Sequence, residues 1–418
     1  MFGLQELFDK QTEEQFRPNK LGVRILENGL EGIGIFITDS QRTDLEDQFS
    51  KIDSGTLNFD FSDEQLHEAG FSSEDELEPK LREVVAGLSS KVEKFSSNID
   101  ETMQGLVDSV TDSMAESILQ TLEDRMDDML DDQDAIYHVF ANNVESIWGE
   151  PLGLMQGLIV IADESAQGYA TRTDEYLKND LIKDLLVRIH AKSVQVAKEI
   201  LTLLRNGFPD GAQARWRTLH ELSVISVFIS EHGEEVAERY ISHEAIDTYK
   251  AAVQYNDYYT RLGAEPISLE EMERMRKDYL KLLELYGQSY RHDYGWAADA
   301  LSLKKPTFRD IESSIALDHH RPYYKAASAN VHGNPTGVLQ SLGLFPEEDI
   351  VLSGPSDIGL TRPAQSAVIS LNIITTTMLT HGANIDSIVV SKAIAKYGRK
   401  VEDAFIAVEM EISPAASV

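Results

Sequence analysis

The sequence predicts an all-α protein, with a C-terminal helical bundle preceded by a long amphipathic, coiled-coil-like helix in an acidic N-terminal region. Two observations predict this class. Apolar residues recur at intervals of three and four through most of the chain, and no segment shows the strand–helix alternation of a doubly wound sheet. We therefore expect three parts, which are residues 1–75, the long helix over residues 76–135, and the bundle over residues 150–410.

Composition narrows the class of protein further. With 418 residues and 42% hydrophobic content, the chain is long enough to bury a sizeable core. No apolar run approaches the length of about 18 residues that a membrane helix needs, and the first residues lack the pattern of a signal peptide. The chain has no cysteine, which excludes disulfides and thiolate chemistry. We therefore expect a cytoplasmic protein with no membrane segment and no cofactor.

The net charge of −33 is concentrated near the N-terminus. Residues 1–135 hold 33 acidic and 11 basic residues, a net charge of −22, so two thirds of the excess lies in the first third of the chain. This asymmetry indicates a separate N-terminal region with its own surface. Because an acidic field repels nucleic acid, any RNA contact requires a local basic patch in the second half of the chain.

The first part of the acidic region, residues 1–75, carries a turn signal. Asn28 and Gly29 lie within the partly alternating run LGVRILENGLEGIGIFIT. An Asn-Gly pair between alternating apolar residues is typical of a β-hairpin, so we expect a small hairpin here.

A long apolar stripe predicts the helix over residues 76–135. Its members are spaced by three and four, with a partial repeat of eleven residues that is typical of a nearly straight helix. They are Leu77, Leu81, Val84, Leu88, Val92, Phe95, Ile99, Met103, Leu106, Val110, Met114, Ile118, Leu122, Met126 and Met129. Either the rest of the same chain covers this stripe, or a second copy or a partner protein does. The acidic run EDRMDDMLDDQD lacks the glycine and spacing of a calcium loop, so we expect no metal.

From Pro151 onward the sequence predicts successive helices separated by turn signals. The expected helices are residues 180–206, 211–231, 234–262, 268–290, 309–332, 363–381 and 387–410. The glycine- and proline-rich stretch from Leu342 to Pro363 predicts a long connection, a kind of segment that often has a function.

Two polar clusters stand out in these apolar helices. In ARWRTLHELSVISVFI, Arg217 and Glu221 share one face four residues apart, with His220 beside them. Two interpretations are open. The pair forms an ordinary surface ion pair, or its apolar neighbours bury it and it requires further partners.

The second cluster lies at the end of the helix that RPYYKAASANVHGNP predicts. Tyr324, Ser328 and His332 are spaced by four and form one stripe of hydrogen-bonding groups. His332 either caps this helix and complements its dipole, or faces Arg217 and Glu221 across the interior. In the second case the combined groups are suited to binding a phosphate or moving a proton.

These residues also carry a resemblance to known proteins. The segments GAQARWRTLHEL, ERYISHEAIDTYK and YYKAASANVHGNP resemble a bacterial family of helical proteins catalogued as domain-of-unknown-function 5677, over roughly residues 180–385. Its recurring features are an Arg-x-x-x-Glu helix and a Tyr-x-x-x-Ser-x-x-x-His helix, matched by Arg217/Glu221 and by Tyr324/Ser328/His332. Such proteins are similar in outline to the HEPN superfamily, helical bundles that include RNA-cleaving toxins and abortive-infection effectors.

The resemblance implies a HEPN-like bundle and a set of site residues. The implied catalytic residues are Arg217, Glu221 and His332, and the surrounding polar network is His220, Tyr324, Ser328 and Arg321. HEPN nucleases carry a His four to six residues after an Arg, whereas here Arg217 precedes His220 by three and Arg321 precedes His332 by eleven. Under this resemblance, the equivalent pair is one formed in space between Arg217 and His332.

Three functions fit these features. The first is an interaction or scaffold protein of bacterial stress response or phage defence, assembled with itself or a partner through the long helix. The second is a HEPN-like ribonuclease or nucleotide-binding effector, in which Arg217 and His332 meet beside positive residues such as Arg188, Lys192 or Arg215. The third is a helical metal hydrolase, suggested by His292-Asp293 and Asp318-His319-His320, although the ordered ligand set is incomplete.

Overall fold

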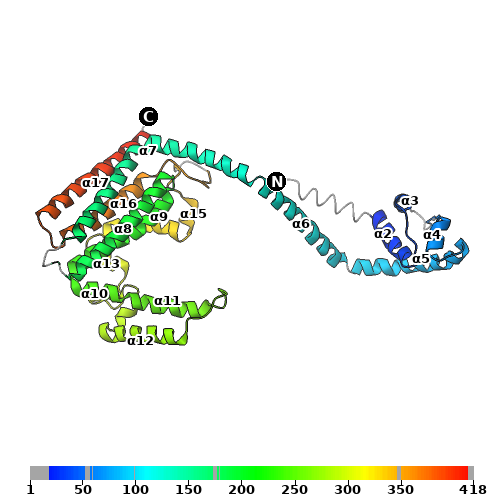
Figure 1. The fold of residues 1–418 in the computed structure, drawn as a ribbon, viewed down its shortest axis with the longest axis horizontal. Helices are drawn as coiled ribbons and strands as arrows, with labels where there is room; N and C mark the ends of the chain where they lie inside the picture. The colour runs from blue at the N-terminus through cyan, green and yellow to red at the C-terminus, as the bar shows by residue number, and fades with distance from the viewer. Residues whose placement is uncertain are drawn as a thin grey trace. The chain divides into compact units, whose positions relative to one another are not determined.

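The computed structural model describes residues 18–51, 57–58, 60–97, 99–172, 177, 179–345 and 350–412. Within these ranges the regular elements are helices and no strand is present, which confirms the predicted all-α class. The chain forms two compact units, the N-terminal unit (residues 1–132) and the C-terminal unit (residues 133–418). Figure 1 labels most of their helices. None of the described helices combines the length and hydrophobicity that a bilayer crossing requires.

The N-terminal unit has a small core of its own. Its helices are α2 (Pro18–Glu31), α3 (Asp39–Lys51), α4 (Asp63–Glu68), α5 (Glu74–Ser97) and α6 (Ile99–Asp124). The core contains Val23, Leu26, Leu30, Ile35, Leu45, Leu66, Leu77 and Val84. A capping box fixes the start of α4, where Ser62 and Gln65 satisfy each other's backbone N–H groups.

The predicted hairpin at Asn28-Gly29 is wrong, because α2 runs through both residues. Val23, Leu26 and Leu30 follow helical spacing and are buried in the small core. Burial of that helical face outweighs the turn preference of the Asn-Gly pair, a local signal that packing often overrides.

The predicted helix over residues 76–135 is divided among α5, α6 and α7 (Met126–Ala170), with Arg125 in a turn between the last two. Helix α7 is 45 residues long, and the part of it that belongs to the C-terminal unit continues through Pro151. Val144, Trp148, Leu152 and Met155 are buried at helical spacing on both sides of this proline, so core packing offsets the backbone hydrogen bond that it removes. The stripe members Leu88, Val92, Phe95, Ile99, Met103 and Leu106 have side chains outside the described residues.

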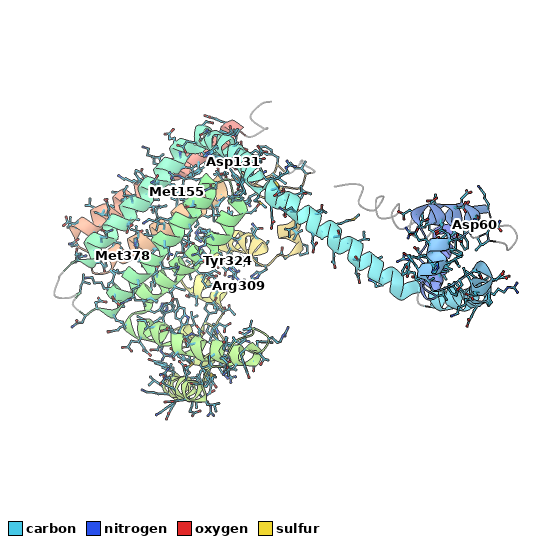
Figure 2. All side chains as sticks on the ribbon, turned by 45° about the vertical axis from the view of Figure 1, so that its right-hand side comes forward. Asp60, Asp131, Met155, Arg309, Tyr324 and Met378 are labelled. Carbon is cyan, nitrogen blue, oxygen red and sulfur yellow. The ribbon has the colours of Figure 1, made fainter. Side chains whose placement is uncertain are left out.

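The C-terminal unit is a bundle around one large core. Helices α8 (Leu181–Arg205), α9 (Pro209–His232), α16 (Thr361–Thr380) and α17 (Ile385–Ile412) pack with the second half of α7 (Figure 1). Buried side chains from all five helices meet in this core, among them Met155 and Met378, which Figure 2 labels. Trp216 Nε1 donates to Ser370 Oγ at 2.9 Å, a hydrogen bond that fixes α9 against α16.

Shorter helices surround this bundle. They are α10 (Glu234–Ser242), α11 (Glu244–Tyr258), α12 (Leu269–Tyr286), η2 (Gln288–Arg291), η3 (Gly295–Ala297), α13 (Phe308–Ser314), η4 (Asp318–His320), α14 (Arg321–Val331) and α15 (Pro335–Leu339). Three predicted helices are therefore divided: residues 234–262 at His243, residues 268–290 at Gly287 and residues 309–332 around η4. Helices α13 and α14 pack on α9, and this contact brings together side chains that are far apart in the sequence.

Candidate functional site

The turn before α9 sets the position of the candidate site. Gly207 has a φ of +71°, a left-handed conformation that glycine adopts without steric cost, and Pro209 begins the helix. Asp210, Gln213, Arg217 and Glu221 then follow at intervals of three, four and four, so they form one stripe along α9. The contacts of these residues with α14 show that the stripe faces that helix.

Arg217 is the centre of the first cluster. Its Nε donates to Glu221 Oε1 at 3.1 Å and to Tyr324 Oη at 2.8 Å. Its Nη1 lies 3.1 Å from His332 Nε2, and its guanidinium carbon lies 4.7 Å from the centre of the Tyr324 ring. Figure 2 labels Tyr324 at this contact of α9 and α14. The structure thus brings together Arg217, Glu221, Tyr324 and His332, which we name the Arg217 cluster.

The Arg217 cluster is partly open to solvent. The side chains of Arg217 and Glu221 are 26% and 31% exposed, and His332 is exposed, whereas Tyr324 is buried. Burial favours the neutral phenol and raises the pKa of Tyr324 above its usual value, and the hydrogen bond to Glu221 adds to this effect. Burial opposes the charge of Arg217, but Tyr324 and Glu221 together raise its pKa, so it remains a cation.

Ser328 does not join the Arg217 cluster. Its hydroxyl donates to the carbonyl oxygen of Tyr324 at 2.9 Å, one turn earlier in α14. The Ser328 carbonyl in turn accepts the backbone N–H of His332 at 3.1 Å, where the helix ends. The predicted stripe of Tyr324, Ser328 and His332 therefore divides, because serine in a helix readily bonds to its own backbone.

His220 and Arg321 belong to a second cluster, centred on Glu312. Glu312 of α13 is completely buried, and its Oε1 lies 2.9 Å from His220 Nε2. Arg321 donates to the other carboxylate oxygen of Glu312, and its guanidinium carbon lies 5.3 Å from the centre of the Tyr324 ring. Tyr324 thus separates the Glu312 cluster from the Arg217 cluster. Burial and the neighbouring His319 and His220 lower the pKa of His320 to about 4, so this ring is neutral at pH 7.

The sequence did not predict Glu312. The available signal was its place in the run FRDIESSI, where Phe308, Ile311 and Ile315 are spaced as one helical face and Glu312 lies four residues after Phe308. An acidic residue beside such a face requires a partner when the face is buried, because an unpaired buried charge is strongly unfavourable. His220 and Arg321 are that partner set.

The remaining predicted groups lie elsewhere. Arg188, Lys192 and Arg215, which we expected beside Arg217 and His332, bond instead to Asp184, Gln195 and Glu199, all on α8. The His319 ring lies 3.1 Å from the carbonyl oxygen of Ala316, three residues earlier in the chain. Across the described ranges, no three His, Asp or Glu side chains are grouped in a way that would hold a metal ion.

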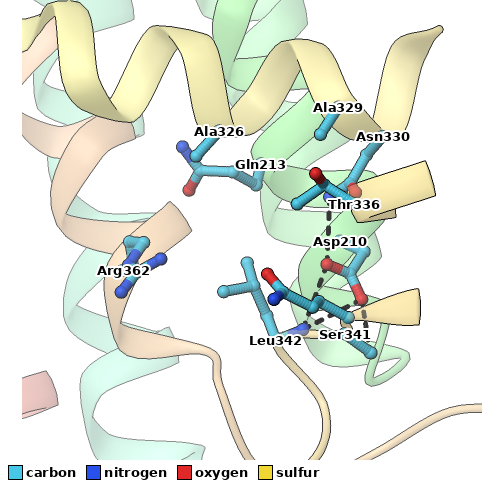
Figure 3. A pocket seen from close by; sticks show the side chains of 10 residues that line it. Asp210, Gln213, Ala326, Ala329, Asn330, Thr336, Ser341, Leu342 and Arg362 are labelled. Atoms are coloured by element: carbon cyan, nitrogen blue, oxygen red, sulfur yellow. Dashed lines mark hydrogen bonds between the residues drawn. The ribbon is translucent and has the colours of Figure 1, made fainter. Parts of the chain in front are cut away.

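A pocket of about 150 Å³ lies beside the Arg217 cluster, between α9, α14, α15 and the start of α16. Figure 3 shows its lining, with Ala326, Ala329 and Asn330 from α14 and Arg362 from α16. Asp210 accepts hydrogen bonds from Asn330, Ser341 and the backbone N–H of Leu342, so its carboxylate holds the pocket wall together. Gln213 is 2% exposed, yet neither atom of its amide has a hydrogen-bond partner among the described residues.

Comparison with known proteins identifies the part of the chain that contains both clusters. Residues 183–349 match the sequence model of a family of unknown function, DUF5677. The match includes Arg217, Glu312, Tyr324 and His332, and it confirms the family resemblance predicted from the sequence. No curated protein and no solved structure matches the chain. Residues 183–349 are therefore a DUF5677 domain, a member of a family of unknown function.

Proposed function

We propose that this chain is a metal-independent ribonuclease of a bacterial stress or phage-defence response, HEPN-like in its use of an Arg–His pair. The observation that supports the proposal is the 3.1 Å contact between Arg217 Nη1 and His332 Nε2, at a site that is partly open to solvent. Arginine binds phosphate through a planar fork of N–H donors, and histidine is the most common general acid or base in catalysis. Together the two groups are suited to bind a phosphodiester and to move the proton that its cleavage requires.

The contacts of Arg217 suit it to hold a phosphate. Its Nε is fixed by Glu221 and Tyr324, whereas Nη2 has no hydrogen-bond partner in the described part of the chain. Nη1 and Nη2 are therefore available to two phosphate oxygens once Nη1 leaves His332. Glu221 and Tyr324 hold the guanidinium in place during this exchange, which keeps the charge aimed at the phosphate.

The exchange would also activate His332. While Nη1 donates to Nε2, the lone pair of that nitrogen is occupied. When a phosphate oxygen replaces Nε2 as the acceptor, the lone pair is free to take the proton from the ribose 2′-hydroxyl. The 2′-oxygen then attacks phosphorus, the bond from phosphorus to the 5′-oxygen breaks, and the leaving oxygen takes a proton from water. The hydroxide that remains takes the proton from His332, which restores the neutral ring. The products are a 2′,3′-cyclic phosphate and a 5′-hydroxyl.

The test is cleavage of a labelled RNA oligonucleotide in the presence of EDTA, with the product ends identified. Wild-type protein should leave 2′,3′-cyclic phosphate ends and should not cleave DNA of the same sequence, which lacks the 2′-hydroxyl. His332→Ala and Arg217→Ala should each lower the rate by a factor on the order of 10² to 10⁴. Arg188→Ala is the matched control, because Arg188 is exposed and pairs with Asp184 within α8, a helix that carries no residue of the Arg217 cluster.

Two outcomes contradict the proposal. One is the absence of cleavage by folded wild-type protein, and the other is equal cleavage by the wild type and both variants. Expression in bacteria gives a second readout, because an RNA-cleaving effector should slow growth and His332→Ala should relieve that effect.

A second candidate function is assembly through the helices around Arg125, as an interaction or scaffold protein. The observation that favours it is a series of exposed apolar side chains in α6 and the start of α7, all in the N-terminal unit, with exposed fractions from 38% to 56%. They are Leu119, Leu122, Met126, Met129 and Leu130. Exposed apolar surface of this extent is typical of an interaction surface.

The assembly function is tested in the full chain. Leu119, Leu122, Met126 and Met129 are replaced together by Ser, and the mass in solution is measured by light scattering after size exclusion. A wild-type mass of two or more chains that falls to one chain in the variant supports self-association. If the wild-type mass is that of one chain, the partner must be a different protein. Capture experiments then compare the proteins bound by the wild type and by the variant. If the variant retains the same bound proteins, this surface is rejected.

A further inference from the structure

The side-chain amide of Gln213 is buried without a hydrogen-bond partner among the described residues. Buried side-chain amides are almost always hydrogen-bonded, because leaving the donor and the acceptor without partners is unfavourable. Both amide atoms of Gln213 lack a partner in the described residues, and the side chain is 2% exposed. Gln213 also lines the pocket between α9 and α14. A polar group left in this state beside a pocket indicates a ligand that supplies the missing partners.

The chemistry of the amide limits the class of ligand. A glutamine amide offers one acceptor and one donor side by side, and it pairs with a ligand edge that carries a donor beside an acceptor. The edges of nucleobases have this arrangement, and glutamine reads them with two hydrogen bonds. The pocket volume of about 150 Å³ suits a single planar ring system, and the small side chains of Ala326 and Ala329 form a low wall beside it.

A positive charge lines the same pocket. Arg362 at the start of α16 is exposed and has no hydrogen bond or ion pair to another described residue. Figure 3 places Arg362 and the Gln213 amide on one side of the pocket and Asp210 on the other. The Asp210 carboxylate already accepts hydrogen bonds from Asn330, Ser341 and the Leu342 N–H. Arg362 is therefore the charged group of the pocket that is available to an anionic ligand.

We propose that this pocket binds one nucleotide, with its base on the Gln213 amide and its phosphate on Arg362. Where this nucleotide belongs to an RNA substrate, the inference rests on the proposed ribonuclease function and makes the pocket the subsite that selects the base. Arg217 lies four residues after Gln213 on the same face of α9, one helical turn away, so a neighbouring phosphate reaches the Arg217 cluster. The base beside the cleaved bond is then the one that Gln213 reads.

The test is calorimetric titration of the full chain with each of the four ribonucleoside 5′-monophosphates. Wild-type protein should bind one of them more tightly than the others. Gln213→Met keeps the length of the side chain but removes both hydrogen-bonding atoms, so it should weaken the preferred nucleotide by roughly tenfold or more. Arg362→Ala should weaken all four nucleotides to a similar extent. Arg309→Ala removes an exposed arginine on α13 and should leave binding unchanged.

The ligand-free melting temperature separates a binding role of Gln213 from a structural one. Because the amide has no partner to lose, Gln213→Met should melt at or above the wild-type temperature. A variant that melts lower or fails to fold shows that the amide supports the fold, and this outcome overturns the proposal. Undetectable binding of all four nucleotides to wild type, or equal binding to wild type and Gln213→Met, overturns it as well.

Arg217→Ala distinguishes this inference from the ribonuclease function. The variant should bind the free mononucleotide with nearly the wild-type affinity while RNA cleavage is lost. Nucleotide binding without any RNA cleavage by wild type would reject the ribonuclease and retain the pocket. RNA cleavage without mononucleotide binding would reject the pocket and retain the ribonuclease.

Discussion

Arg217 donates a hydrogen bond from Nη1 to Nε2 of His332 across 3.1 Å. Arginine has no acceptor atom and remains protonated in proteins, so Nε2 must be the acceptor. The His332 ring is therefore held as the neutral tautomer with its proton on Nδ1. This tautomer places the basic nitrogen on the side of the ring that faces Arg217, where the proposed phosphate would bind.

The first prediction concerns this tautomer. Long-range ¹H–¹⁵N NMR of wild-type protein at pH 8 should show the His332 proton on Nδ1. In Arg217→Lys, the point charge of lysine cannot contact Glu221, Tyr324 and His332 together, so His332 should change towards the mixture of tautomers of a free imidazole. His138 is exposed on α7 and is the control ring, which the substitution should leave unchanged. An Nε2-protonated His332 in wild-type protein would contradict the contact.

The second prediction concerns the buried acid. Glu312→Ala leaves His220 and Arg321 without their shared partner, so the free energy of unfolding should fall by about 3–5 kcal/mol. Urea denaturation at pH 7 measures this change. Glu284→Ala removes an exposed carboxylate from α12 and should change stability by less than about 0.5 kcal/mol. Similar midpoints for the two variants would mean that the Glu312 cluster does not hold α13 and α14 on α9.

The all-α class and part of the candidate site could be predicted because their signals are local. The spacing of Arg217 and Glu221, and of Tyr324 and His332, places each pair on one helical face, and packing of α9 on α14 then joins the pairs. The hairpin at Asn28-Gly29 was wrong because a turn signal of two residues competes with a buried helical face that extends over α2. A turn signal of two residues thus does not by itself end a helix whose apolar face is buried.

Glu312 and Gln213 could not be predicted, because their roles depend on packing. The role of the Glu312 carboxylate depends on the packing of α13, which places it against His220, a residue 92 positions earlier in the chain. Gln213 has no partner because the wall opposite it is formed by α14, α15 and the start of α16, and no spacing rule connects these segments. In the sequence, both residues resemble ordinary polar positions of a helix.

The third prediction concerns the turn that positions α9. A Cβ atom at residue 207 would lie 2.4 Å from Phe140 Cζ and 2.7 Å from the Ser356 carbonyl oxygen, and φ is +71°. Gly207→Ala should therefore lower stability by about 2–5 kcal/mol, through backbone strain and overpacking together. Gly263→Ala is the matched control, since its φ is +64° but nothing lies within 4 Å of the added Cβ. It should cost about 1–2 kcal/mol in the same urea experiment. Equal losses of stability in Gly207→Ala and Gly263→Ala would mean that Phe140 and Ser356 move away from the added Cβ at little energetic cost.

The fourth prediction concerns stability at acidic pH. His190 of α8 is buried, its Nε2 lies 3.0 Å from Thr375 Oγ1, and burial lowers its pKa to about 4 from the ordinary value of 6.5. Thr375 Oγ1 donates to the Leu371 carbonyl, so it accepts from His190, whose neutral ring fits the core. Between pH 6.5 and pH 4 the unfolded chain binds a proton at this residue and the folded chain does not. The linked stability is therefore fully present above pH 6.5 and is lost as the pH falls through this range, by about 3 kcal/mol.

His190→Gln isolates this contribution, because glutamine keeps a donor for Thr375 and does not titrate. Urea denaturation of the variant at a series of pH values should show a loss between pH 6.5 and pH 4 that is about 3 kcal/mol smaller than in wild-type protein. Part of the wild-type loss should remain, because His320 also has a pKa lowered to about 4 and protonates in the same range on unfolding. His138→Gln on the exposed surface of α7 should follow the wild-type profile. If His190→Gln follows it too, His190 is already protonated in the folded protein and the bundle accommodates its charge.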